Sequence, residues 1–298
     1  MAAAPQQRPG TPDDAVDGLV PARVVRPVSL GAARDAVRNA ARAGEALVAS
    51  GRGRHLAVGG APQRLDVLLT LDRLDRVREH AAADMTVTAE AGCTLAALDA
   101  TLATVGQWLP LDPPAPDATT VGGLIAANLS GPLRASQGTV RDLLLGLRWI
   151  GPDGALVSGG GRVVKNVAGY DLPKVHVGAL GTLGVVAEAT FKLRPRPERE
   201  RALLLGCDDA ASAVAAALAV RDAVEPAWLE IASGTVVGVD APFAVAGGFL
   251  GVEAEVEAAV ARARAAALAA PATVVAALGD AEAGALRRRL AELALAPA

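Results

Sequence analysis

The stretch GGGRVVKNVAGYDL, residues 159–172, holds the densest group of unusual residues in the chain. It starts with three glycines, contains the only tyrosine, Tyr170, and is followed by GALGTLGVV over residues 178–186. Glycines allow turns and the close approach of a ligand, but they add no side chain to a core. The glycines beside Lys165 and Tyr170 therefore indicate a binding segment, although Asp171 is also explained as the cap of a following helix.

The lysines of the chain mark the same region. Lys165, Lys174 and Lys192 are the only lysines, and every other basic side chain is an arginine. Lys165 is the lysine that we expect to have a specific role. It could place positive charge near a bound ligand, or it could simply pair with Asp171.

A second glycine-bearing loop, GRGRH at residues 51–55, follows a short apolar run. Two glycines one residue apart let backbone N–H groups converge on an anion, and the flanking Arg52, Arg54 and His55 add charge-assisted hydrogen bonds. The loop therefore suits a pyrophosphate. A Rossmann fingerprint is excluded, because residues 56–66 contain glycine and proline instead of a helix pattern. Taken alone, the loop is equally explained as a surface turn.

A third segment, PDATTVGG at residues 116–123, runs into AANLSG at residues 126–131. Gly122 and Gly123 leave room for another surface, and the threonines before them offer donors to a polar ligand. The alternative is that the glycine pair lets a helix pack tightly against a strand. The segment alone favours that alternative.

Composition narrows the class of protein. The chain has 298 residues, enough for about two domains, and is 52% hydrophobic but only 2% aromatic. Its net charge of −3, with arginines scattered among carboxylates, predicts no nucleic-acid partner. Cys93 and Cys207 form no CxxC motif and no Cys/His cluster, so we expect no metal site in the chain and two buried, reduced thiols.

The sequence also predicts a location. No apolar run reaches the roughly 20 residues that a membrane span needs. Residues 1–17 lack the charged start and apolar core of a signal peptide. We therefore expect a cytoplasmic protein, with any association with the inner face of the cell membrane being peripheral and made through a partner.

Hydrophobic spacing predicts the secondary structure. Helical spacing covers residues 29–43, 94–105, 209–220, 253–268 and 281–293. Strand patterns cover residues 46–49, 67–71, 85–91, 143–150, 155–158, 185–193, 203–206, 227–232, 244–250 and 273–277.

The RPRP sequence at residues 194–197 stops the last strand of the glycine-rich region, so we place a domain boundary there. Residues 1–28 are predicted to be an N-terminal tail and residues 29–197 a first domain. Residues 198–298 form a smaller domain, in which the expected order of strand, helix, strand, strand, helix and strand is ferredoxin-like.

Together, the three glycine-bearing segments resemble the flavin domain of the PCMH-type, or vanillyl-alcohol oxidase, family of FAD enzymes. KNVAGYDL at residues 165–172 and GTLGV at residues 181–185 are similar to glycolate oxidase subunits and D-2-hydroxyacid dehydrogenases. The short chain and residues 160–172 point to the FAD-binding subunits of the E type in bacterial glycolate oxidases. The resemblance implies an α+β fold, with a two-lobed PCMH-type FAD-binding domain followed by a reduced ferredoxin-like α/β cap.

The resemblance also implies where FAD binds, with its pyrophosphate on the GRGRH loop at residues 51–55, which we call the first loop. The implied cofactor-binding residues are Gly51, Arg52, Gly53, Arg54, His55, Asp112, Pro113, Thr119, Thr120, Gly122, Gly123, Asn128, Gly131, Gly184, Val185 and Val186. Some relatives attach flavin covalently to a histidine of the first loop. Because His55 aligns with a residue that is usually small, we expect non-covalent FAD.

The resemblance implies an FAD-dependent oxidoreductase, but the catalytic histidines are missing. Competent hydroxyacid dehydrogenases of this family have paired histidines in a larger cap, whereas residues 201–298 contain none and His55, His80 and His176 all precede them. The favoured reading is an FAD-binding accessory subunit of a glycolate oxidase or dehydrogenase complex that oxidises glycolate to glyoxylate. Chemistry would lie in a larger FAD-containing partner subunit, and electrons would pass to an iron–sulfur subunit.

Two other readings stay open. The chain could be a self-sufficient FAD-dependent oxidoreductase of another small hydroxy acid, with Lys165 or Tyr170 acting near the flavin. It could also be a non-enzymatic scaffold that keeps the fold without the cofactor, although the glycine pairs at residues 51 and 53 and at residues 122 and 123 argue against this.

Overall fold

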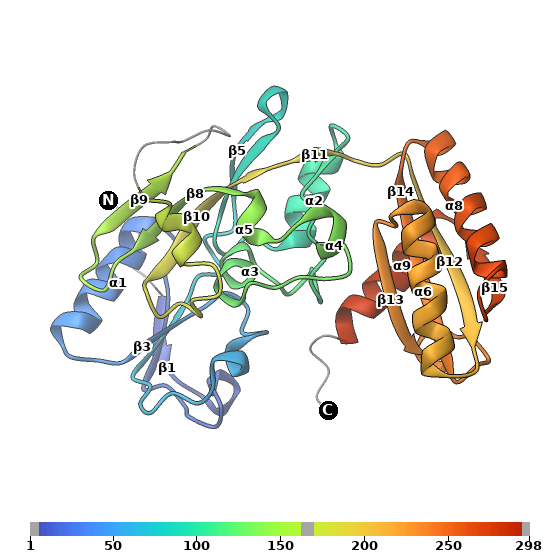
Figure 1. Ribbon diagram of the computed structural model, residues 1–298. Helices are drawn as coiled ribbons and strands as arrows, with labels where there is room; N and C mark the ends of the chain where they lie inside the picture. Colours follow the sequence, from blue (N-terminus) through green and yellow to red (C-terminus); the bar gives the residue numbers. More distant parts are fainter. Residues whose placement is uncertain (1–5, 162–169, 294–298) are drawn as a thin grey trace. The chain divides into compact units, whose positions relative to one another are not determined.

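The computed structural model describes residues 6–161 and 170–293 (Figure 1). The chain divides into two compact units. Unit 1 comprises Met1–Leu109, Ala115–Leu129 and Thr139–Arg194, and unit 2 comprises Pro110–Pro114, Ser130–Gly138 and Pro195–Ala298. Two short excursions from the first half of the chain thus belong to unit 2. Our division at residues 197 and 198 stays a prediction that does not include these excursions.

Unit 1 contains a four-stranded sheet in the order β1-β2-β4-β3. Its strands are β1 (Gln6–Pro9), β2 (Arg23–Arg26), β3 (Leu47–Ser50) and β4 (Val67–Thr70). β1 pairs antiparallel with β2, whereas β2 and β3 each pair parallel with β4. α1 (Leu30–Arg42) connects β2 to β3, and the Ser29 hydroxyl caps its first turn by accepting a hydrogen bond from the Ala32 N–H.

The predicted N-terminal tail over residues 1–28 is wrong for the residues that the structure describes. β1 and β2 lie in this stretch and pair with each other over four residues. The polar, exposed sequence QQRP gives β1 no apolar alternation, so its strand conformation comes from the pairing with β2 and not from a local pattern.

The second sheet of unit 1 has the order β5-β6-β10-β8-β9, with every neighbouring pair antiparallel. Its strands are β5 (Val77–Ala81), β6 (Thr86–Glu90), β8 (Leu144–Ile150), β9 (Leu156–Gly160) and β10 (Val185–Lys192). The central strand β10 is buried along most of its length. α3 (Val121–Ala127) packs against β10 and β6, which places Gly122 and Gly123 on this sheet.

Shorter elements complete unit 1. The helices are α2 (Leu95–Ala103) and α5 (Val140–Leu143), with 3₁₀ turns η1 (Pro12–Asp14), η2 (Leu56–Gly59), η3 (Ala82–Asp84) and η4 (Leu172–Val175). Two-residue strands occur at β7 (Gln107–Trp108) and at β11 (Arg194–Pro195), whose second residue belongs to unit 2. The predicted helices at 29–43 and 94–105 are confirmed as α1 and α2, with ends that differ by a few residues.

Unit 2 is built on an antiparallel sheet in the order β13-β14-β12-β15. The strands are β12 (Arg199–Cys207), β13 (Trp228–Ser233), β14 (Phe243–Gly251) and β15 (Thr273–Leu278). The helices are α4 (Arg134–Gln137), α6 (Ala210–Val224), α7 (Gly234–Val237), α8 (Glu253–Leu268) and α9 (Asp280–Leu293). α6 and α8 pack together against the sheet, and their contacts enclose a core that includes Leu203, Val220 and Phe249.

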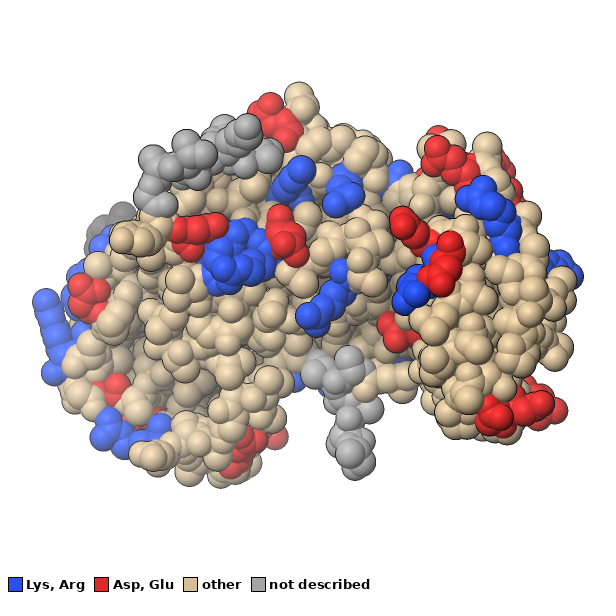
Figure 2. Space-filling view, viewed as in Figure 1, with Lys and Arg blue, Asp and Glu red and all other residues tan. Residues whose placement is uncertain are grey.

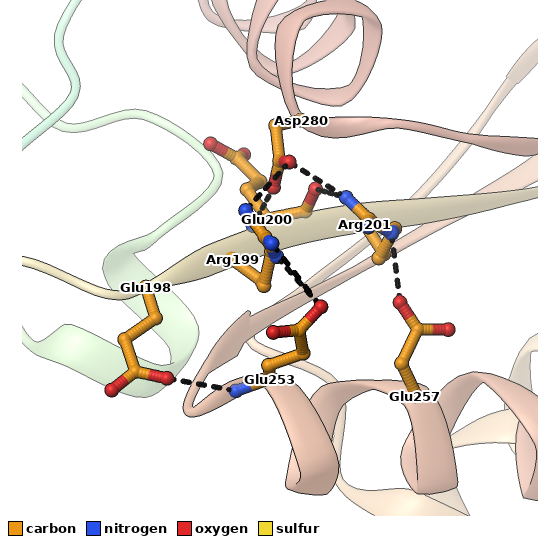
Figure 3. A network of polar contacts seen from close by, with 7 residues as sticks. All are labelled: Glu198, Arg199, Glu200, Arg201, Glu253, Glu257 and Asp280. Carbon is orange, nitrogen blue, oxygen red and sulfur yellow. Dashed lines mark hydrogen bonds and ion pairs between the residues drawn. The ribbon is translucent and has the colours of Figure 1, made fainter.

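An ion-pair network joins the start of β12 to α8 and α9 (Figure 3). Arg199 pairs with Glu253 at 3.1 Å, and Arg201 pairs with Glu257 at 3.0 Å and with Asp280 at 2.9 Å. These side chains are between 23% and 57% exposed to solvent, so each pair contributes about 0–1 kcal/mol. On the face in Figure 2, acidic and basic side chains are interspersed elsewhere as well.

Candidate cofactor-binding site

Unit 1 contains a cavity of about 380 Å³. Its walls come mainly from three stretches, residues 47–62, 118–127 and 180–186, with Val16, Leu71 and Ala91 beside them. Each of the three glycine-bearing segments singled out in the sequence contributes to the cavity. Segments far apart in the chain thus meet at one place.

The first loop begins where the parallel strand β3 ends. Ser50 is the last residue of β3, and Gly53 has φ of +75°, a left-handed conformation that suits glycine. A Cβ at Gly51 would overlap the side chain of Thr120. Glycine at position 51 therefore lets the first loop lie directly against the segment that begins α3.

The second stretch is fixed by Thr120. Its Oγ1 accepts a hydrogen bond from the Gly123 N–H at 3.2 Å and caps α3. A Cβ at Gly122 would lie 3.0 Å from the Cβ of Ala91 on the neighbouring chain segment. The tight-packing explanation of the glycine pair thus holds for Gly122, while both glycines also line the cavity.

The third stretch of the cavity wall, residues 180–186, lies against the end of α3. The Leu180 N–H donates to the Ala126 carbonyl at 2.9 Å, and the Gly178 N–H donates to the Ile125 carbonyl at 3.0 Å. Gly184, with φ of +148°, packs against Trp149, since a Cβ there would lie 3.0 Å from Cδ1 of the indole. These contacts hold residues 180–186 at the cavity.

His176 packs against the same indole. The ring centroids of Trp149 and His176 are 4.5 Å apart. Burial lowers the pKa of His176, so the neutral imidazole is favoured. His176 belongs to the support of the third stretch and does not line the cavity.

Most of the predicted cofactor-binding residues lie at the cavity. Those that line it are Gly51, Arg52, Gly53, Arg54, His55, Thr120, Gly122, Gly123, Gly184, Val185 and Val186. Thr119 and Asn128 do not line it, although both adjoin α3. Asn128 ends that helix with φ of +50°, and the Thr119 carbonyl accepts a hydrogen bond from the Leu95 N–H.

Asp112, Pro113 and Gly131 belong to unit 2 and also do not line the cavity. Asp112 accepts hydrogen bonds from the Leu133 N–H at 3.2 Å and from Nη1 of Arg287, also at 3.2 Å. Gly131 packs so closely on Asp112 that a Cβ there would overlap its carbonyl oxygen. The two positions are thus together, but in a buried structural contact.

Burial dominates the electrostatics of Asp112. Desolvation raises its pKa to about 6, against the opposing effect of the nearby Arg287 cation. Arg287 gives its two closest bonds to Glu200, at 2.7 Å and 3.1 Å. One guanidinium therefore bonds to two carboxylates, Asp112 and the partly buried Glu200, and its bonds to Glu200 are the shorter ones.

The weak catalytic candidates are not placed at the cavity. Lys165 lies outside the described residues. Tyr170 is 94% exposed and does not line the cavity. Lys174 is used structurally, because its Nζ donates to the Leu144 carbonyl at 2.6 Å and to the Arg141 carbonyl, and burial lowers its pKa.

Sequence reasoning missed several cavity residues. Among them are Val16, Ser50, Leu56, Ala126, Leu180, Gly181 and Thr182. Gly181 and Thr182 lie inside the quoted GALGTLGVV motif, which was a sufficient signal for them. Val16 lies in the stretch predicted as a tail, and no local pattern connects it with the cavity.

Both cysteines are buried and reduced, as predicted. Burial raises the pKa of the Cys93 thiol to about 11, which makes it a poor nucleophile. Within residues 6–161 and 170–293, no group of three or more His, Cys, Asp or Glu side chains is arranged to hold a metal ion. No helix among these residues is sufficiently long and apolar to cross a bilayer.

The chain is similar to known proteins over part of its length. Residues 21–160 match the family described as FAD binding domain. The glycolate oxidase subunit GlcE of Escherichia coli (strain K12) is 43% identical over 121 residues, which are 40% of this chain and 35% of that protein. The glycolate oxidase subunit GlcD of Bacillus subtilis (strain 168) is 33% identical over 187 residues, 62% of this chain and 39% of that protein.

Solved structures extend the likeness of the fold. An alkyldihydroxyacetonephosphate synthase superposes with a TM-score of 0.75 at 19% identity, covering 92% of this chain and 57% of the other. At this identity, the likeness concerns the fold alone. The alignments with the curated relatives span less than two fifths of the length of each relative.

Proposed function

We propose that the chain holds FAD in the cavity of unit 1 and acts in a glycolate oxidase-type oxidoreductase, because residues 21–160 match the family described as FAD binding domain. The observation that carries the proposal is the meeting of the three glycine-bearing stretches at one cavity. Each stretch alone also had a structural explanation, so their convergence on one cavity is the stronger observation.

The residues at the cavity fit an extended dinucleotide. Arg52 and Arg54 supply positive charge on the first loop, which suits a diphosphate. Gly51, Gly122 and Gly123 keep side chains out of the region where the first loop meets α3. The remaining walls are largely apolar, as is usual for sites that bury an aromatic ring system.

FAD, when bound, supplies an acceptor for a hydride from a substrate carbon. The contribution of this chain is to bind and orient the cofactor and to exclude water from it. Val185 and Val186 line the cavity at the start of β10, a largely buried strand. FAD is proposed to bind without a covalent link, although His55 lies at the cavity.

We place the chain as an accessory subunit of a complex that oxidises glycolate to glyoxylate. Two of its relatives are described as glycolate oxidase subunits, which supports a multi-subunit assembly. Residues 201–298 contain no histidine to act as a base near neutral pH. The proposed partners are therefore a larger FAD-containing subunit, where the chemistry occurs, and an iron–sulfur subunit that accepts electrons.

The purified chain tests this proposal through its visible spectrum. We expect a yellow protein whose flavin is released by acid precipitation and is not bleached when glycolate is added alone. A colourless protein that does not take up added FAD contradicts the cofactor assignment. Rapid bleaching by glycolate contradicts the accessory role and favours a self-sufficient dehydrogenase. Co-expression with its partners should restore glycolate-dependent reduction.

A further inference from the structure

We propose that the outer face of α8 (Glu253–Leu268) is an interface at which a second copy of the chain docks, with the two α8 helices antiparallel. The helix belongs to unit 2, whereas the proposed cofactor site belongs to unit 1. The docking is therefore independent of the proposed binding of FAD.

α8 has apolar residues on two sides. One side packs into the core of unit 2 through Val256, Ala263 and Ala267. The other side is exposed and carries apolar residues spaced alternately four and three residues apart, Ala254, Ala258, Ala261, Ala265 and Leu268. This is the heptad spacing at which one helix packs along another in a coiled coil, and we call these five residues the outer seam. The outer seam therefore indicates a partner helix.

Two large apolar side chains lie at the ends of α8. Leu268 in the last turn is 65% exposed, and Val252 at the N-cap is 50% exposed. When two α8 helices pair antiparallel about the midpoint between Ala258 and Ala261, Val252 of each copy comes level with Leu268 of the other. The large exposed side chains then cover each other, and the alanines between them let the two helices approach closely.

The charges beside the outer seam fit the same antiparallel arrangement. Glu255 and Glu257 flank its first half, and both are exposed. Arg262 and Arg264 flank its second half and are exposed as well. Glu255 and Arg262 are one heptad apart on one side of the seam, and Glu257 and Arg264 are one heptad apart on the other. In an antiparallel pair, flanking positions on the same side meet across the two-fold axis, so each glutamate lies beside an arginine of the second copy.

α6 extends the surface beside the outer seam. α6 and α8 pack together on the same face of the sheet, so their outer faces point away from it together. On α6, Val214 is 48% exposed and Leu218 is 43% exposed, and no charged residue lies between Asp209 and Arg221. Figure 2 shows uncharged surface over the middle of α6. A stable interface buries about 1,200–2,000 Å², and α6 supplies apolar area in addition to the seam.

The association state of the full-length chain with FAD tests this interface. Sedimentation velocity over a range of concentrations should show a dimer that dissociates on dilution. Glu255→Arg and Arg262→Glu each bring like charges together, and we expect each to raise the dissociation constant of the dimer about tenfold. An equimolar mixture of the two variants restores opposite charges across a mixed dimer. Its dissociation constant should therefore return close to that of the wild type.

Arg289→Glu on α9 is the matched control for Arg262→Glu, because Arg289 is exposed but lies on another helix. It should leave the dimer unchanged. Ala258→Glu places a carboxylate of each copy in the middle of the outer seam, so it should weaken the dimer more than either charge reversal does. Circular dichroism and flavin content are measured for every variant, and both should match the wild type. Loss of folding and loss of FAD are thus recognised separately.

A wild-type chain that stays monomeric at every concentration overturns the assignment of a second copy to this face, including when the chain associates with a different subunit. A dimer that neither charge reversal weakens, or that the mixture of variants does not restore, overturns the antiparallel pairing. If a charge reversal prevents folding, Ala258→Glu decides the question. An unchanged dimer in that folded variant overturns the interface as well.

Discussion

Gly51 is the cavity residue with the tightest steric constraint. A Cβ there would overlap Oγ1 of Thr120, and this same atom accepts the hydrogen bond that caps α3. We therefore expect Gly51→Ala to displace either the first loop or the cap. Overpacking of this kind costs about 1–3 kcal/mol. The expected result is a lower melting temperature and a reduced ratio of flavin absorbance to protein absorbance after purification.

Gly59→Ala is the matched control for Gly51→Ala. Gly59 also lines the cavity, but an added Cβ would meet the side chain of Leu180 at 3.7 Å, an ordinary van der Waals contact. This variant should keep the wild-type flavin content. If both variants retained the flavin equally, close approach at Gly51 would not be needed for the site.

At the residue scale, the sequence predicted the glycines of the cavity better than its polar residues. Gly51, Gly53 and Gly122 were recognisable because closely spaced glycines indicate a local constraint on the backbone. Asp112 was assigned to the cofactor by resemblance, whereas its side chain lies 3.2 Å from Arg287. No local pattern encodes a contact between residues so distant in the chain.

At the scale of elements, the predictions succeeded where the apolar pattern is strong. β10 was predicted from a buried apolar run that is closed by RPRP, and α8 from its helical spacing. β1 and β5 were missed because their side chains are mainly polar or exposed, and both are edge strands defined by pairing. α3 was missed because two glycines lower its helix propensity, which its cap at Thr120 and its buried residues offset.

The pairing of β13 with β14 supplies a prediction at this scale. Trp228 lies opposite Gly248, and a Cβ at Gly248 would overlap the buried indole. Gly248→Ala must therefore move a large, fully buried side chain or separate the two strands. We expect a loss of about 1–3 kcal/mol in the free energy of unfolding, measured by urea denaturation and by a change in tryptophan fluorescence.

The neighbouring glycine provides the comparison. At Gly247, an added Cβ would meet Cδ1 of Leu229 at 3.3 Å, the far end of a flexible side chain that can move by a small amount. Gly247→Ala should therefore cost clearly less than Gly248→Ala. The explanation through Trp228 is wrong if the two substitutions destabilise the protein equally.

At the scale of the whole molecule, unit 2 depends on residues from three separate stretches of the chain. Arg287 on α9 bonds to Glu200 on β12 and to Asp112 in the excursion Pro110–Pro114. Removing its charge by Arg287→Met leaves Asp112 and the partly buried Glu200 without this cation. We expect a loss of about 3–5 kcal/mol, measured by chemical denaturation at pH 7. Arg288→Met is the control on the next residue, which lies on an exposed side of the helix.

The same cluster predicts a dependence of stability on pH. Burial raises the pKa of Asp112 to about 6 in the folded protein, whereas the unfolded carboxyl titrates near 3.8. Between these values, the folded state holds a proton that the unfolded state has released. The favourable contribution of protonated Asp112 is therefore complete below about pH 4 and is lost as the pH rises through about 6.

Asp112→Asn removes this titration while keeping the shape of the side chain. The free energy of unfolding of the variant minus that of the wild type should rise between about pH 4 and pH 6, by up to about 3 kcal/mol, and then level off. Asp280→Asn gives the opposite comparison, because a backbone hydrogen bond from Glu200 and the pairing with Arg201 lower the pKa of Asp280. Its contribution is lost only as the pH falls below about 4. Urea denaturation between about pH 2 and pH 7 measures both differences, and a flat difference for Asp112→Asn between about pH 4 and pH 6 would mean that burial does not raise the pKa of Asp112.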